Sequence, residues 1–320
     1  MNATHFVLNP RNYGVPAREE LVAHRIWDTH YHGFMGGRGG TVAAETEALK
    51  FHYDRMLAQH HAALFYSQRM GIERVIALDI GGLEGQLGDR GLSPKQKERN
   101  EFVDAQQRKT LADEKDRVSG IIRIHPGYPE ESCAKMEKWI RNGPCIGIKY
   151  SGAAGGVSCS HSNNDSIIRL ARELNAVVYV HAWFLVGGEP RTWTGGMKPG
   201  ESTPLDVAIL ARRFPDVPII CGHSGGDWEL GARAVRACEN VFFEFSGSDP
   251  HSGQLDYAVN ELGADRIVWG GHGPSRSYST ELSKVFDAKL TTLERMKVLG
   301  VNYRRMVQKI FKQKGYPLTV

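Results

Sequence analysis

Three features are missing from this 320-residue sequence, and each absence excludes a class of protein. Its five cysteines are odd in number and include no Cys-x-x-Cys pair, so neither a disulfide framework nor a zinc knuckle is indicated. No apolar run reaches the roughly 18–20 residues of a membrane-spanning helix, and the start lacks the pattern of a signal peptide. We therefore expect a cytoplasmic protein in a reducing compartment that does not enter a membrane.

The sequence also lacks a block of charge of one sign. Forty basic residues stand against 36 acidic ones, and the net charge of +4 is spread along the chain. Nucleic-acid binding needs a concentrated basic patch, so it is not indicated. With 41% hydrophobic and 24% charged residues, the composition is that of an ordinary globular protein that can bury a sizeable core. A small-molecule substrate is the expected partner.

Short β-rich runs alternate with helical patterns along the whole chain, which indicates parallel βαβ units. The expected strands are 24–28, 74–79, 118–125, 145–150, 176–181, 217–222, 241–245 and 266–270. The expected helices are 45–70, 95–115, 129–142, 164–174, 204–214, 227–239, 251–262, 281–287 and 290–312. Eight such units close naturally into a (β/α)8 barrel, predicted here as one domain over 1–320 with an N-terminal extension, 1–23. A doubly wound open sheet is the alternative, but no Gly-x-Gly-x-x-Gly follows the first strand.

Two predicted loops differ from the others in composition. The loop 33–40 is rich in glycine, and the loop 183–203 combines glycines and prolines with Trp183 and Trp193. Such a loop can form a lid over a pocket. Packing of the tryptophans between neighbouring loops explains the pattern equally well, so 183–203 is a possible lid.

The most informative motif is Asp28-Thr29-His30-Tyr31-His32, which follows the apolar pair Ile26-Trp27. Side chains alternate along a strand, so His30 and His32 share one face. Two imidazoles held in this way can bind one metal ion. A lone His-x-His is more often a surface or packing pair, but further histidines stand at the ends of later strands.

Those later histidines matter because the strand ends of a barrel surround one axis, and the active site lies at the carboxyl ends of the strands. The polar residues expected there are His125, His181, His223, His272, Lys149 and Glu244. For His125 we favour a strand-capping role through backbone hydrogen bonds. His52, His60 and His61 fall on the first long helix and are interpreted as surface or packing residues.

In these motifs and their order, the chain resembles the amidohydrolase superfamily and, within it, the amidohydrolase 2 group of metal-dependent hydrolases and decarboxylases. The motifs that carry the resemblance are 26–32 (IWDTHYH), 147–149 (GIK), 180–181 (VH), 219–226 (IICGHSGG), 266–274 (RIVWGGHGP) and 298–306 (VLGVNYRRM). Each motif alone is weak, but the ordered set over roughly 24–310 is specific.

The resemblance implies roles for individual residues. His30, His32 and His181 would ligate one divalent metal, most often zinc, with manganese as an alternative. His223 would lie beside the metal as a general acid/base or would polarise the substrate. Lys149 matches a lysine that some relatives use as a bridging ligand, and we interpret it as a substrate contact.

The eighth strand departs from the family pattern. The family's motif ends there in Gly-Ser-Asp, whose aspartate touches the metal and moves the proton, whereas this chain has Gly270-Gly271-His272. His272 can still ligate a metal and accept a proton, so we count it as both a ligand and a catalytic residue. Because it replaces a negative charge with a neutral ring, we expect weaker activity than in relatives.

These residues predict a metal-dependent hydrolase in which a metal-activated water attacks a small amide, ester or lactone. A decarboxylase of an aromatic or muconate-type acid needs the same ligands and stays open, as do a metal-free lactone hydrolase and a barrel without turnover. Candidate clamps for a substrate carboxylate are Lys149, Arg191 and Arg276, and for each arginine a structural role is equally plausible. The closing helices and aromatic loops offer surface for a homodimer or higher homo-oligomer.

Overall fold

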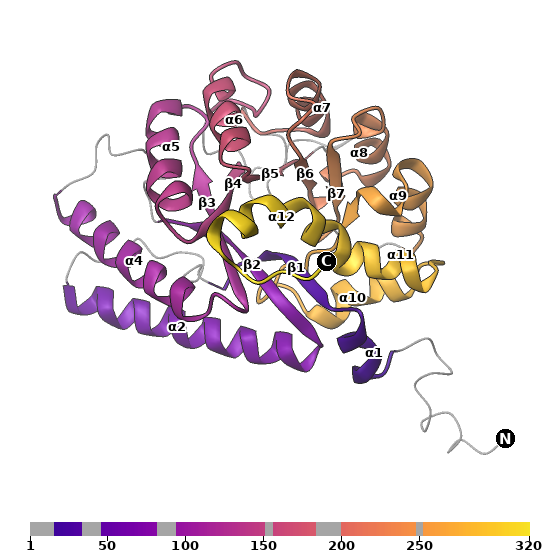
Figure 1. The fold of residues 1–320 in the computed structure, drawn as a ribbon, viewed down its shortest axis with the longest axis horizontal. Coiled ribbons are helices and arrows are strands. Elements are labelled where there is room, and N and C mark those ends of the chain that lie inside the picture. Colours follow the sequence, from indigo (N-terminus) through magenta and orange to yellow (C-terminus); the bar gives the residue numbers. More distant parts are fainter. Residues whose placement is uncertain (1–15, 34–45, 82–93, 151–155, 184–199, 248–251) are drawn as a thin grey trace.

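A computed structural model describes residues 16–33, 46–81, 94–150, 156–183, 200–247 and 252–320 (Figure 1). Its centre is one sheet of eight parallel strands whose spatial order is their chain order. The strands are β1 (Ile26–Tyr31), β2 (Ile72–Ile80), β3 (Val118–Ile124), β4 (Cys145–Tyr150), β5 (Val177–His181), β6 (Ile219–Gly222), β7 (Val241–Glu244) and β8 (Ile267–Val268). The predicted (β/α)8 barrel is confirmed, and the doubly wound alternative is wrong because its strand order would not be sequential.

The barrel closes between its last and first strands through backbone contacts just beyond β8. Thr29 donates to the carbonyl of Trp269 from its backbone N at 3.2 Å and from its hydroxyl at 2.8 Å. The backbone N of His32 donates to the carbonyl of Gly273 at 2.7 Å. This closure brings residues 269–273 beside the end of β1, so the last strand's loop meets the His-x-His motif.

Helices surround the strands in Figure 1. They are α1 (Arg18–Ala23), α2 (Thr46–Arg69), α4 (Pro94–Asp113), α5 (Pro129–Met136), α6 (Asn164–Glu173), α7 (Pro204–Arg213), α8 (Trp228–Val235), α9 (Gln254–Leu262), α10 (Tyr278–Phe286), α11 (Thr292–Met296) and α12 (Asn302–Lys314). The π-helical segments Glu137–Arg141 and Lys297–Val301 continue α5 and join α11 to α12. In the described part of the chain, none of the helices has the length and apolarity to cross a membrane.

Helix α12 packs against the end of the barrel at which the strands begin, and it crosses in front of the strands in Figure 1. Trp27 of β1 is buried against Phe311 of α12, with 5.6 Å between ring centroids. The guanidinium of Arg74 lies over both rings, at 5.1 and 5.2 Å from their centroids. Asn302, part of the predicted closing motif, donates to the carbonyls of Ala264 and Ile267 and so fixes the start of β8. This end of the barrel is filled by packing, which leaves the carboxyl ends of the strands for chemistry.

Two predicted strand boundaries are wrong. The sequence predicts the first strand at 24–28, but it spans Ile26–Tyr31; it begins late because Arg25 adopts a left-handed φ of 51° in the turn after α1, and it ends three residues beyond the predicted end. His24 is therefore no strand residue; it ends α1 and packs on Phe286 at 5.7 Å. The eighth strand was expected at 266–270 but pairs as a strand only at Ile267–Val268. The other expected strands and helices match within a few residues.

Candidate metal centre

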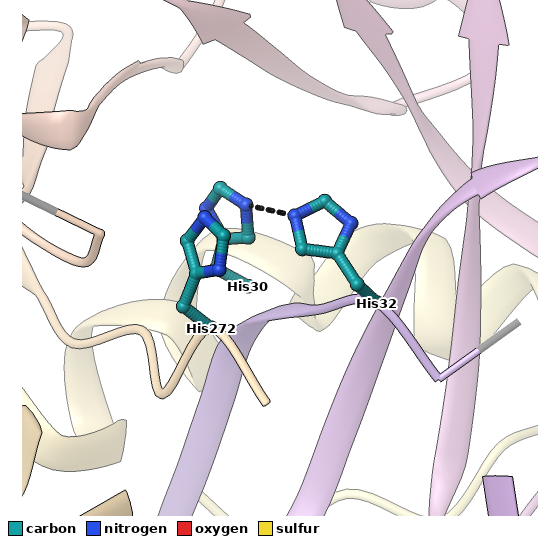
Figure 2. Close-up of side chains that lie close together, drawn as sticks. All are labelled: His30, His32 and His272. Carbon is teal, nitrogen blue, oxygen red and sulfur yellow. Dashed lines mark hydrogen bonds between the residues drawn. The ribbon is translucent and has the colours of Figure 1, made fainter. Parts of the chain in front are cut away.

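Three histidine side chains converge at the carboxyl end of the barrel (Figure 2). His30 and His32 come from β1 and its end, on the shared face that the strand period predicts, and their Nε2 atoms are 2.8 Å apart. His272 lies in the loop after β8, and its ring stacks on that of His30 with 4.3 Å between centroids. Each of the three offers a nitrogen within 4.8 Å of the others, which is the spacing of a metal-ligand group.

A second group shares His30 and lies deeper in the barrel. It consists of His30, His223 after β6 and Glu244 at the end of β7, and all three are buried. The Nδ1 of His223 lies 2.8 Å from the carbonyl oxygen of Ser246. A carbonyl can only accept, so this nitrogen carries the proton and Nε2 bears the lone pair. That Nε2 is buried and makes no hydrogen bond within the part of the protein that the structure describes.

The loops that present His223 and His272 are sharply turned. Both histidines have left-handed backbone conformations, with φ of 58° and 50°. Such a conformation is uncommon for residues other than glycine and costs roughly 1–3 kcal/mol. After β6 the turn continues through Ser224 (φ 54°) into two glycines with positive φ. The sequence Gly-His-Ser-Gly-Gly therefore bends the chain at once after the strand and leaves His223 facing the barrel axis.

Burial favours the neutral form of His30, His223 and His272. Burial lowers the pKa of His223 to about 4, although Glu244 and the hydrogen bond to Ser246 oppose this shift. Burial and the neighbouring histidines also lower the pKa of His30 and of His272 well below the usual value. Neutral imidazoles are the form that binds a metal ion, so the electrostatics favour the ligand state at neutral pH.

Asp28 supports the cluster from below. Its Oδ1 accepts hydrogen bonds from the backbone N of His30 at 2.9 Å and of Gly271 at 2.6 Å, joining β1 to the loop after β8. Burial raises the pKa of Asp28 to about 8, although these two hydrogen bonds oppose the rise. A Cβ at position 271 would lie 2.5 Å from the ring of Tyr278 and 2.8 Å from the Asp28 carboxylate, so glycine is required there.

The other predicted metal and catalytic residues lie around this centre. The ring of His181, at the end of β5, is 4.4 Å from that of His223, and its Nε2 is 3.8 Å from the carboxylate of Glu201. His181 therefore borders the cluster, but it belongs to neither of the two three-residue groups found among the described residues. Its role as a metal ligand stays a prediction.

The predicted substrate contacts are placed differently from one another. Lys149 is buried in β4, with its ammonium 5.6 Å from the centre of the Tyr179 ring. Arg276 is exposed, donates to the carbonyl of Gly247 at 3.2 Å and lines a surface pocket with α2 residues. Arg191 and most of the possible lid 183–203 fall outside the described residues. The ends of that loop are joined, because the backbone N of Trp183 donates to the carbonyl of Ser202 at 2.8 Å.

Two of the histidines that the sequence analysis interprets as structural, His125 and His60, make hydrogen bonds of a structural kind. The Nδ1 of His125 accepts a hydrogen bond from the backbone N of Gly127 at 3.2 Å, which confirms the capping role. His60 is buried in α2 and bonded to Tyr31 and Glu114, whereas His61 is exposed. The side chain of His52 is outside the described part of α2.

Sequence reasoning missed Tyr179. Its hydroxyl lies 2.6 Å from both His30 Nδ1 and Glu244 Oε2, so it links these two side chains. The available signal was its position two residues before His181 on the same strand, which places both on the inner face. Glu244 was recognised at a strand end but was given no role.

Comparisons with known proteins agree with this architecture. A family model described as Amidohydrolase matches residues 79–308, most of the chain, and the chain belongs to this family. The match begins after β1, so the His-x-His motif lies outside it. No curated protein matches the sequence significantly.

Several solved structures share the fold at low sequence identity. A protein from Staphylococcus aureus described as a putative amidohydrolase has a TM-score of 0.63 and 17% identity, covering 88% of this chain and 98% of that one. The 5-carboxyvanillate decarboxylase of Sphingomonas paucimobilis has a TM-score of 0.62 and 12% identity, with 89% and 99% covered. A dihydroxybenzoic acid decarboxylase from Polaromonas, solved with manganese and 2-nitroresorcinol, has a TM-score of 0.64 and 16% identity, with 88% and 96% covered.

Proposed function

We propose that this protein is a metal-dependent enzyme that acts on a small carboxylic acid, and that it removes the carboxyl group as carbon dioxide. The observation that carries the metal is the convergence of His30, His32 and His272 at the carboxyl ends of the strands. Imidazole nitrogens are usual ligands for zinc, whereas manganese prefers oxygen ligands, which a substrate carboxylate would add; the histidines therefore fit a divalent ion without identifying it. The decarboxylases of the same fold that were solved with manganese support this choice of cofactor class.

The charge of the site favours an anionic substrate. Burial and neighbouring charges hold the pKa of His30 and of His272 low, and imidazole binds a metal in its neutral form, so a divalent ion beside these ligands would add to the positive charge of the buried Lys149. Glu244 supplies one negative charge from below, and its oxygens already accept hydrogen bonds from Tyr179, Ser246 and His223. The remaining positive charge would be neutralised by a substrate carboxylate, which a decarboxylase requires and a lactonase does not.

Decarboxylation breaks the bond between the carboxylate carbon and the neighbouring carbon; carbon dioxide leaves, and the electron pair stays on that neighbour. The neighbour then takes up one proton. A bound divalent ion would hold and orient the carboxylate. His223 is our candidate for moving the proton, because its buried Nε2 bears a lone pair that would first take a proton from a water molecule and then donate it to that carbon. Lys149 would contact the substrate.

Hydrolysis, which the sequence predicts, remains the second candidate. The same Nε2 of His223 favours it, because a buried basic nitrogen beside the candidate ligands can also take the proton of an attacking water. The two reactions use the same ligands and differ in the substrate.

The test begins with metal content. Purified protein would be incubated with MnCl2 or ZnCl2, desalted and analysed for bound metal, with about one ion per chain expected. It would then be offered 2,6-dihydroxybenzoate and 5-carboxyvanillate, with carbon dioxide release as readout, beside a panel of neutral amides, esters and lactones. The His30→Asn variant should lose both metal and turnover. The matched variant His61→Asn, which changes an exposed histidine, should retain them.

The outcomes separate the proposals. Turnover of acids supports the decarboxylase, and turnover of the neutral panel alone overturns it in favour of the hydrolase. Bound metal without turnover of either panel supports a barrel that has lost its activity. Turnover that survives chelation contradicts the metal requirement.

A further inference from the structure

Beneath the candidate ligands, three fully buried side chains from three different strands form a chain of hydrogen bonds. The Nδ1 of His30 on β1 lies 2.6 Å from the hydroxyl of Tyr179 on β5. The same hydroxyl lies 2.6 Å from Oε2 of Glu244 on β7. All three side chains have an exposed fraction of zero. None of these contacts involves the face of His30 that is turned toward His32 and His272.

The direction of each hydrogen bond follows from the chemistry of the partners. A carboxylate can only accept, so the single hydroxyl proton of Tyr179 is donated to Glu244. The hydroxyl oxygen can then only accept from His30, which therefore carries its proton on Nδ1. A neutral imidazole with Nδ1 protonated bears its lone pair on Nε2. That is the nitrogen 2.8 Å from Nε2 of His32.

The surrounding backbone holds this chain in place. The carboxylate of Glu244 also accepts from the backbone N of Ser246 at 2.6 Å and of His223 at 3.2 Å. Glycine is required at two adjoining positions, since a Cβ at Gly222 would lie 2.2 Å from the Tyr179 hydroxyl and one at Gly270 would lie 2.4 Å from Oε1 of Glu244. The space is thus shaped for this pair of side chains.

The same contacts decide how Glu244 acts. His30, His223 and Glu244 have the spacing of a second metal-ligand group. Yet His30 presents Nδ1 to this side, at 3.5 Å from Glu244, and that nitrogen is engaged by Tyr179 at the shorter distance of 2.6 Å. A metal there would have to break the hydrogen-bond chain, whereas a metal at Nε2 leaves it intact.

We infer that Tyr179 and Glu244 are positioning residues that fix the tautomer and ring orientation of His30, so that Nε2 is the metal-binding nitrogen and Glu244 supports a single metal site without ligating it. The inference rests on the proposed metal-dependent function. Partners of this kind raise the basicity of a ligating imidazole, and losing one typically lowers metal affinity by about 10–100-fold.

The experiment compares Tyr179→Phe with Tyr31→Phe. Both replace a fully buried strand tyrosine whose hydroxyl contacts Nδ1 of a histidine, but Tyr31 faces His60 on α2 and not the cluster. Zinc and manganese affinities would be measured by chelator competition. We expect Tyr179→Phe to weaken binding about 10–100-fold at an unchanged stoichiometry, and Tyr31→Phe to leave affinity unchanged.

A second readout needs neither metal nor turnover. In metal-free protein labelled with 15N-histidine, long-range 1H–15N correlation spectra report which ring nitrogen of His30 is protonated, with His30→Asn giving the assignment. Wild type should show Nδ1 protonated, and Tyr179→Phe should show a mixture of tautomers. This result can be obtained even if no metal binds. Failure of the hydrogen-bond chain to fix the tautomer of His30 is therefore distinguishable from failure of the proposed function.

Glu244→Gln gives a third, independent arm. If the carboxylate acts through the tyrosine, the effects of the two substitutions on metal affinity should not add. The double variant Tyr179→Phe/Glu244→Gln should then have the same affinity as whichever single variant binds metal more weakly. Additive losses of metal affinity would overturn the inference, because they would mean that Glu244 acts on the metal directly and not through Tyr179. An unchanged tautomer and affinity in Tyr179→Phe would overturn it as well.

Discussion

Two side-chain networks in this barrel contain the same three residue types in a different order. On the outer side of β1, Tyr31 and Glu114 both bond to His60, at 2.9 Å and 2.7 Å, so the imidazole stands in the middle. On the inner side, Tyr179 stands in the middle, between Glu244 and an imidazole at the end, His30. The order decides how many ring nitrogens remain for a ligand.

In the outer network both nitrogens of His60 are engaged, so its imidazole can only join α2 to its neighbours. In the inner network one nitrogen is engaged and the other faces His32 at 2.8 Å. His30 and Tyr31 are adjacent in the sequence, and strand alternation sends one inward and the other outward. A single strand thus supplies both a structural contact, Tyr31, and a candidate ligand, His30, and residue type alone does not distinguish the ligand His30 from the structural His60.

The sharpest way to break this comparison is to remove each imidazole in turn. We expect His30→Asn to reduce bound zinc from about one ion per chain to a small fraction, because the cluster loses its shared ligand. We expect His60→Asn to keep the metal but to lower the free energy of unfolding by about 1–3 kcal/mol, because it leaves buried polar partners unsatisfied. Metal analysis and urea denaturation of metal-free protein measure the two effects. The comparison fails if both variants lose metal equally.

A second prediction concerns the negative charge that is absent at position 272, beside the candidate ligands His30 and His32. His272→Asp places a carboxylate beside the other imidazoles, and we expect metal affinity to rise by at least about tenfold, since two opposite charges a few ångströms apart attract by more than 1.4 kcal/mol. The φ of 50° at this position suits aspartate and asparagine, which adopt left-handed conformations more readily than most residues.

Asparagine is therefore the matched control for that substitution. His272→Asn keeps the shape of the aspartate without its charge, so it should bind metal no more tightly than wild type. Turnover on an accepted substrate should also rise in His272→Asp. Equal behaviour of the two variants, or an unchanged rate, would contradict the idea that the neutral residue weakens the site.

The barrel itself could be predicted because its signals are local. Apolar runs alternate with amphipathic segments, and polar residues follow the runs at the carboxyl ends of the strands. The convergence of His30, His32 and His272 follows from that topology without any knowledge of side-chain contacts. The first strand was misplaced because the structure buries it on both faces: Trp27 and Tyr31 pack outward while Asp28 and His30 point inward, and no alternation marks its end.

The inward direction of Tyr179 could be predicted from its position two residues before His181, but its role could not, because that role depends on the register of distant strands. In the run Val177–Val180 a tyrosine has the pattern of a packing residue, and its partner Glu244 is 65 positions away. Only the pairing of β5 with β6 and of β6 with β7 brings the two together. A single sequence specifies which residues face inward, but it does not specify which of them meet.

The smallest expected effect concerns the outer carboxylate, Glu114. Burial by itself raises the pKa of Glu114, but hydrogen bonds and charge interactions with His60 and His61 outweigh it and hold the pKa below the ordinary value of 4.5. The unfolded chain therefore binds more protons than the folded one near that pH. The stability from Glu114 is complete above 4.5 and is lost as the pH falls through the lower, folded-state pKa.

Urea denaturation at several pH values between about 3.5 and 6 tests this sign. In Glu114→Gln the free energy of unfolding should fall less steeply with acidification than in wild type, while Glu173→Gln, which changes an exposed carboxylate, should follow wild type. Metal affinity at neutral pH should be the same in all three proteins, because the outer network ends at His60 and Tyr31 and does not reach the cluster. Weaker metal binding in Glu114→Gln would mean that the two faces of β1 are coupled, and the separation between structural and ligand histidines would then have to be abandoned.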